Sequence, residues 1–186
     1  MRLLTQVPES VLWLGQANAE AQRHLRNEGQ RRGVPAERLV FARYVAAAAD
    51  HLSRLRLADL FLDTLPYNAH ATANDALWAG LPVLTCAGAG FAGRVAASLL
   101  RSVGLPDLVT DSLQAYEDIA LQLARDPDAL ASIRQKLARN RATAPLFDTS
   151  RYMRDLESAY AEMWRRRRHG LPAACFAVHD SAGAAP

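Results

Sequence analysis

Short apolar runs alternate with longer, mostly polar segments over the first 110 residues. The apolar runs cover residues 10–14, 38–42, 60–62, 81–85 and 108–110. The segments between them are predicted as helices, at about 17–32, 46–57, 73–79 and 92–102, and glycine or proline ends most of them. Alternating strands and helices predict an α/β fold, a parallel sheet with helices on both faces.

The rest of the chain is predicted to be helical. Helices are expected at 113–125 and 128–140, and a last one from a Thr149 or Ser150 cap to about residue 168. We expect the apolar face of this last helix to pack on the body of the domain. Residues 1–168 should form one domain and the Ala-, Gly- and Pro-rich residues 169–186 a flexible tail. The apolar face consists of Met153, Leu156, Tyr160, Met163 and Trp164.

The stretch from Leu57 to Cys86, LADLFLDTLPYNAHATANDALWAGLPVLTC, is predicted to form strand, loop, helix and strand. Thr72 and Asp75 have the spacing of a capping box at the start of the helix. Gly80 suits the end of that helix, and Pro82 prevents its continuation. The loop thus leaves the carboxyl end of a strand and enters a helix N-terminus, where α/β proteins bind ligands and anions.

Candidate chemistry gathers around this loop. His70 and Thr72 could reach a bound phosphate, while Asp75 could either cap the helix or accept a hydrogen bond from a sugar hydroxyl. His51 and Arg54, after the second strand, could bind a phosphate or a base, or form a solvated helix face. The pattern leaves a ligand site and a plain capped helix both open.

Composition and charge exclude several classes of protein. The net charge of +3 is concentrated in residues 165–168, a solvated helix end rather than a nucleic-acid surface. No apolar run is long enough for a membrane span, and the N-terminus lacks a signal-peptide core, so we expect a cytoplasmic protein. Cys86 and Cys175 make neither a disulfide framework nor a metal site. The residues by themselves indicate an α/β domain that binds a phosphorylated ligand.

Longer motifs in this chain resemble a known family. The central stretch, then FAGRVAASLL, then APLFDTSRYMRDLESAYAEMW, are similar to the C-terminal catalytic half of the protein O-linked N-acetylglucosamine transferases, the SPINDLY-like family. The resemblance implies the Rossmann-like C-terminal half of a two-domain, GT-B type glycosyltransferase. Such an enzyme transfers N-acetylglucosamine from UDP-N-acetylglucosamine to Ser or Thr of an acceptor protein with inversion, without a metal or other cofactor.

The resemblance also implies roles for individual residues. His70 and Thr72 would contact the diphosphate, together with the backbone N–H of Ala71, which replaces a second threonine of the family motif. Asp75 would bind the ribose, and His51 and Arg54 would lie near the uridine and diphosphate. The backbone at Leu14 would line the sugar or nucleotide pocket. The loop at residues 87–94, AGAGFAGR, departs from the family pattern because its Glu, Thr and Ser are lost.

The family's N-terminal half and tetratricopeptide repeats are expected to lie outside this chain and to act as partners. Three interpretations follow: a UDP-sugar-binding half that is active beside such a partner, a stand-alone UDP-binding module, or an inactive remnant. The sequence leaves the sugar open, since members of the SPINDLY group also use fucose donors.

Overall fold

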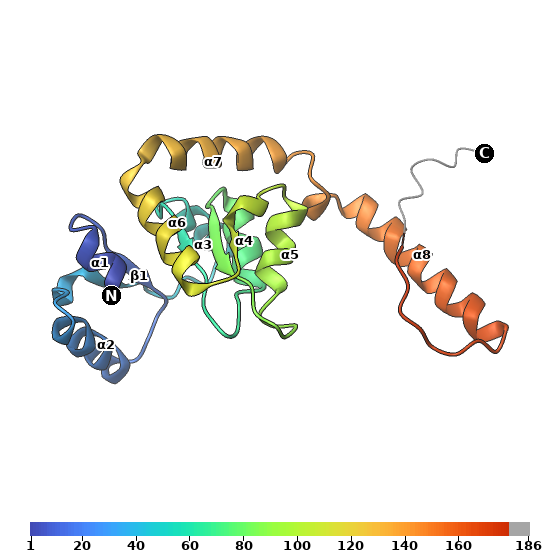
Figure 1. The fold of residues 1–186 in the computed structure, drawn as a ribbon, viewed down its shortest axis with the longest axis horizontal. Coiled ribbons are helices and arrows are strands. Elements are labelled where there is room, and N and C mark those ends of the chain that lie inside the picture. The colour runs from blue at the N-terminus through green and yellow to red at the C-terminus, as the bar shows by residue number, and fades with distance from the viewer. Residues whose placement is uncertain (179–186) are drawn as a thin grey trace.

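The computed structural model describes residues 1–178, and the α/β alternation is confirmed in it (Figure 1). A short helix, α1 (Arg2–Gln6), precedes the first strand and was not predicted. Helix α7 (Pro127–Asn140) begins one residue earlier than predicted, and Asp126 caps it. The strands are β1 (Leu12–Leu14), β2 (Leu39–Phe41), β3 (Phe61–Leu62), β4 (Val83–Cys86) and β5 (Val109–Thr110). The helices are α1 (Arg2–Gln6), α2 (Ala19–Arg31), α3 (Ala48–Leu55), α4 (Ala71–Ala79), α5 (Val95–Ser102), α6 (Leu113–Arg125), α7 (Pro127–Asn140) and α8 (Thr149–Arg168).

All the strand pairs are parallel, as predicted, but the strands form two sheets instead of one. Strand β1 pairs with β2, while β4 lies between β3 and β5. The smaller sheet has its own core of Leu4, Val34 and Leu39, and it lies with α1 and α2 to one side of the main body (Figure 1). Strand β1 is half-buried along its length, and within the described residues its strand partner is β2.

The main core surrounds β4, whose residues are all buried. This burial explains the unbroken apolar run in the sequence, since a central parallel strand is covered on both faces. Leu77 of α4, Leu100 of α5 and Leu137 of α7 are fully buried in the same cluster. Each such side chain contributes about 1.5–3 kcal/mol of transfer free energy. Gly80 ends α4 with a φ of 90°, as its predicted place after the helix requires.

Helix α8 does not pack as predicted. It leads away from the body (Figure 1), and Tyr160, Met163 and Trp164 are 60%, 52% and 65% exposed. Its cap is Asp148, whose carboxylate accepts a hydrogen bond from the N–H of Arg151 at 2.8 Å, rather than Thr149 or Ser150. The apolar spacing correctly predicted a helix, but spacing carries no information on whether another surface covers the helix.

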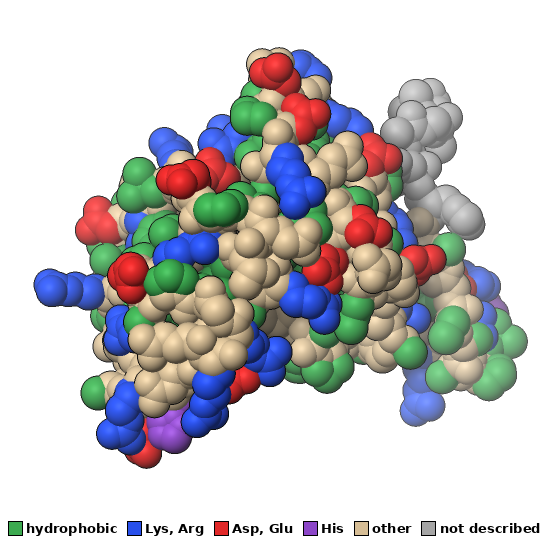
Figure 2. All heavy atoms as spheres, turned by 60° about the vertical axis from the view of Figure 1, so that its left-hand side comes forward, with side chains coloured by type: hydrophobic (Ala, Val, Ile, Leu, Met, Phe, Trp, Pro, Cys, Tyr) green, Lys and Arg blue, Asp and Glu red, His purple; other side chains and the backbone are tan. Residues whose placement is uncertain are grey.

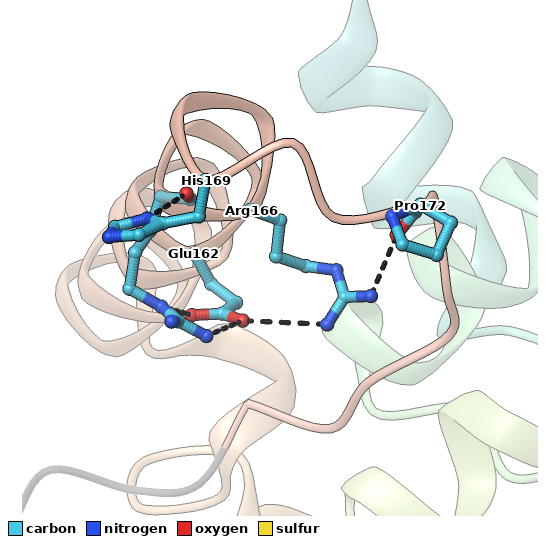
Figure 3. Close-up of polar contacts among 5 residues, drawn as sticks. Glu162, Arg166, His169 and Pro172 are labelled. Carbon is cyan, nitrogen blue, oxygen red and sulfur yellow. Dashed lines mark hydrogen bonds and ion pairs between the residues drawn. The ribbon is translucent and has the colours of Figure 1, made fainter.

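Charged side chains of both signs are interspersed on the face of the molecule drawn in Figure 2. At the end of α8, Arg166 lies between Glu162 and Pro172 (Figure 3). Arg165 pairs with Glu162 at 2.7 Å, and Arg166 donates to the carbonyl of Pro172 at 2.7 Å. Residues 171–178 are exposed and contain no helix or strand, and the rest of the predicted tail, 179–186, lies outside the described residues. None of the helices in residues 1–178 is long and apolar enough to cross a membrane.

Candidate functional site

The loop after β3 is built on Asp63. This carboxylate is buried, and it accepts hydrogen bonds from the backbone N–H of Thr64 at 2.8 Å and of Ala69 at 2.7 Å. Its second oxygen accepts from the Thr85 hydroxyl at 2.6 Å. The side chain therefore fastens both ends of the loop to β4. Asp63 was not singled out from the sequence; its signal was a carboxylate that directly follows the apolar run at residues 60–62.

A second loop, residues 87–94 after β4, lies against the first. The carbonyl of Ala92 accepts from the N–H of Asn68 at 3.0 Å and lies 3.3 Å from Nε2 of His70. A side chain at Gly93 would bring its Cβ within 3.1 Å of the Pro66 carbonyl oxygen and of the Cα of Gly88. The glycines here permit a close approach of two backbones, so this loop is a lid over His70 and its neighbours.

His70 is the N-cap residue of α4, and its ring is held on several sides. Tyr67 stacks on the ring with centroids 4.9 Å apart, and Phe91 meets it edge-on at 6.2 Å. Both aromatic side chains are themselves mostly exposed. His70 is half-buried and lies at the carboxyl edge of the main sheet.

The predicted capping box is wrong. Helix α4 begins at Ala71, so Thr72 lies within its first turn with an exposed side chain, and no side chain caps the helix. In residues 1–178 the backbone N–H groups of Ala71, Thr72 and Ala73 have no hydrogen-bond partner. Three free donors at the positive end of a helix dipole are well suited to an anion.

A polar chain connects α3 with α4. Arg54 donates to Nδ1 of His51 at 3.0 Å and to the carbonyl of Arg43. Nε2 of His51 lies 3.9 Å from Oδ2 of Asp75, whose side chain is 43% exposed. Because a guanidinium can only donate, Nδ1 of His51 must be the acceptor, and its Nε2 carries the proton facing Asp75. Asp75 therefore pairs with His51 and does not cap the helix.

The structure thus places the residues expected at the site, apart from Leu14, on α4 or on its neighbour α3. They form two groups, one at the first turn of α4 with His70 and one made of His51, Arg54 and Asp75. Leu14 is separate, at the end of β1 in the smaller sheet, where its carbonyl accepts from the N–H of Ala42 at 2.9 Å. No hydrogen bond among residues 1–178 joins it to His70 or His51. Its place in a pocket stays a prediction. The residues near His70 are His70, Ala71 and Thr72, and those of the polar chain are His51, Arg54 and Asp75.

Comparison with known proteins decides the family. The model of glycosyl transferase family 41 matches residues 1–156, which include both groups of site residues. The chain belongs to glycosyl transferase family 41. The predicted resemblance is therefore confirmed. Family 41 accounts for the parallel α/β architecture, because its members have the GT-B fold.

Relatives in family 41 cover nearly the whole chain. It is 39% identical over 172 residues (92% of the chain) to the Caenorhabditis elegans "UDP-N-acetylglucosamine--peptide N-acetylglucosaminyltransferase". It is 37% identical over 180 residues (96%) to the Arabidopsis thaliana "Probable UDP-N-acetylglucosamine--peptide N-acetylglucosaminyltransferase SEC". A solved structure, "Thermobaculum terrenum O-GlcNAc transferase mutant - K341M", matches with a TM-score of 0.84 at 35% identity over 91% of the chain.

The family-41 relatives are much longer than this chain. It spans 15% of the C. elegans protein, 18% of the Arabidopsis protein and 33% of the T. terrenum chain. What the chain does within a family-41 transferase is therefore a separate question from its membership. Within residues 1–178, no three His, Cys, Asp or Glu side chains lie close enough together to hold a metal ion.

Proposed function

We propose that this chain supplies the UDP-sugar-binding site of a protein O-GlcNAc transferase-type reaction. In that reaction the N-acetylglucosamine of UDP-N-acetylglucosamine is transferred, with inversion and without a metal, to a Ser or Thr hydroxyl of a protein. The observation that carries the proposal is the uncapped N-terminus of α4, with three free N–H groups beside His70, whose Nε2 contacts the Ala92 carbonyl. Donors of this kind can stabilise the charge that develops on a departing diphosphate.

The second group suits the nucleoside. Asp75 retains a partly exposed carboxylate, which can accept hydrogen bonds from ribose hydroxyls. The His51 ring, held by Arg54, is half-buried and offers a flat face beside the same helix. Thr72 adds an exposed hydroxyl in the first turn, and Ala71 adds its N–H only. The groups that bind the acceptor protein and the remaining catalytic groups would lie in the parts of a family-41 enzyme that this chain does not span.

A specific observation supports a second candidate, a module that binds UDP without transferring sugar. Ala71 and the lid residues Ala89 and Gly90 carry no hydroxyl or carboxylate, although the family motifs have polar residues at these positions. A site with fewer side-chain donors can retain affinity through backbone N–H groups while stabilising the transition state less well.

Isothermal titration calorimetry of the purified chain with UDP tests the proposal, with UMP and GDP as controls. We expect selective UDP binding with a dissociation constant near 1 μM, about −8 kcal/mol. His70→Ala should weaken UDP by about 1–3 kcal/mol, the cost of a lost hydrogen bond to a charged group. His24→Ala is the matched control, because His24 lies on α2 and is exposed. Absence of UDP binding, or equal binding of GDP, would contradict the proposal.

A further inference from the structure

The two histidines of the site differ in the role of the nitrogen that is hydrogen-bonded, which accepts in His51 and donates in His70. Arg54 donates to Nδ1 of His51, so that nitrogen carries no proton and the ring is neutral. At His70 the partner is an acceptor, the carbonyl of Ala92, 3.3 Å from Nε2. A carbonyl can only accept, so Nε2 of His70 carries a proton. Nδ1 of His70 has no hydrogen-bond partner in the described part of the chain.

This arrangement limits how His70 can bind an anion. With its proton on Nε2, a neutral imidazole offers only a lone pair at Nδ1, and a lone pair repels a phosphate oxygen. Nδ1 can donate to a diphosphate only when the ring is doubly protonated. The other neutral tautomer, with its proton on Nδ1, would lose the hydrogen bond from Nε2 to the Ala92 carbonyl, and Tyr67 and Phe91 pack against the same ring.

We propose that the lid at residues 87–94 positions His70 through the Ala92 carbonyl, so that binding of a nucleoside diphosphate sugar is coupled to uptake of one proton at Nδ1. The inference rests on the proposed function. The proton comes from the buffer when the diphosphate binds and returns to it when the ligand leaves. His51 takes no part in the uptake, because Arg54 keeps its Nδ1 as an acceptor.

The surroundings of His70 permit this change of charge. Among residues 1–178 no acidic or basic side chain forms a hydrogen bond or ion pair with its imidazole. Asp63 is occupied by its own loop, and Asp75 faces His51. The incoming diphosphate would therefore be the charge that favours the protonated ring. The titratable and charged side chains of the elements packed around His70 are Asp50, His51, Arg54, Asp63, Tyr67, Asp75, Cys86, Arg94 and Arg101.

Calorimetry with UDP-N-acetylglucosamine tests the coupling, because both phosphates of this ligand are esterified and do not titrate near neutral pH. Titrations at one pH in HEPES and in Tris, which differ in ionisation enthalpy, report the protons taken up. The difference between the two buffers should show net proton uptake on binding. The affinity should fall as the pH rises.

Three variants locate the proton. His70→Gln should abolish both the uptake and the pH dependence, while His51→Gln should retain the uptake even where the affinity falls. His24→Gln, on α2, should leave both unchanged. Nitrogen-15 NMR of the free chain provides a readout without ligand, in which neutral His70 should show the Nε2–H tautomer.

The outcomes separate this inference from the proposed function. UDP-N-acetylglucosamine binding without proton uptake, uptake that persists in His70→Gln, or an Nδ1–H tautomer would overturn the inference and leave the binding site standing. Failure of the wild-type chain to bind the nucleotide sugar at any pH would overturn both the proposed function and the coupling. Uptake that is lost only in His70→Gln supports the inference.

Discussion

Replacing Asp63 with asparagine tests whether one buried carboxylate holds the site loop in place. The new side chain would have nearly the same shape, so no cavity is created. Its amide oxygen can still accept from the N–H groups of Thr64 and Ala69, now 2.8 and 2.7 Å from Oδ1 of Asp63. Its NH₂ group, however, would face the Thr85 hydroxyl, which now donates to Oδ2, so that hydroxyl must turn to accept.

The expected loss in the free energy of unfolding follows from the two backbone hydrogen bonds whose acceptor would no longer be charged. A bond to a charged group contributes about 1.5–3 kcal/mol and a neutral one about 0.5–1.5, so each backbone bond should weaken by about 1 kcal/mol. Two such bonds give a loss of about 2 kcal/mol in the free energy of unfolding. For a domain of this size that lowers the melting temperature by about 4–8 °C. Asp63→Ala, which leaves the Ala69 N–H and the buried Thr85 hydroxyl unpaired, should cost about 4 kcal/mol.

Urea unfolding followed by circular dichroism measures this loss, and UDP titration of the same protein measures its effect on the site. Asp59→Asn is the matched control, because Asp59 is a carboxylate near β3 whose side chain is 83% exposed and pairs with Arg134. This control should change the free energy of unfolding by less than about 0.5 kcal/mol. If Asp63→Asn were as stable as Asp59→Asn and bound UDP as the wild type does, Asp63 would not hold the loop.

Three other changes test the loops and their chemistry. Gly93→Ala should lower the free energy of unfolding by about 1–3 kcal/mol, since its Cβ meets only backbone atoms. Gly90→Ala is the control and should leave the free energy of unfolding unchanged, because nothing lies within 4 Å of its Cβ. Equal melting temperatures of the two variants would refute the close approach of the two loops. Tyr116→Phe removes the hydroxyl that donates to the Asp63 carbonyl at 3.0 Å and should cost about 1 kcal/mol in thermal unfolding. Burial raises the pKa of the Tyr116 hydroxyl well above its ordinary value, so the tyrosine ionises first in the unfolded chain. The wild type should therefore lose stability above about pH 10, and a Tyr116→Phe variant with the same pH profile would contradict this. EDTA should leave the affinity for UDP unchanged in calorimetry, and a large loss would point to a metal-dependent site.

Much of the site could be predicted because its residues lie close together in the sequence. His70 and Thr72 belong to one loop and one first turn, and His51 and Arg54 to one turn of α3, so spacing along the chain places each pair. The start of α4 was predicted two residues too late. A capping box is a local preference, and here Asp63 and Ala92 fix the loop from outside, so that His70 takes the cap position instead.

The contacts across the sheet could not be predicted from spacing. The Asp63–Thr85 hydrogen bond, the Ala92 carbonyl beside His70 and the His51–Asp75 pair each join residues more than 20 positions apart. Sequence patterns report which residues share a helix face or a strand, and they do not report which loops meet. The exposure of α8 was missed for the same reason, because an apolar stripe gives no information on what lies opposite it.

The sequence by itself determined the order of the strands and of the α-helices after β1, the parallel α/β class and the family, since these depend on periodicity and on motifs of contiguous residues. Only the tertiary structure decided that the strands divide into two sheets, that a buried aspartate anchors the site loop, and that His51 accepts a hydrogen bond from Arg54 while His70 donates one to Ala92. These features depend on distances between segments, and packing of the whole core, rather than any local preference, fixes those distances.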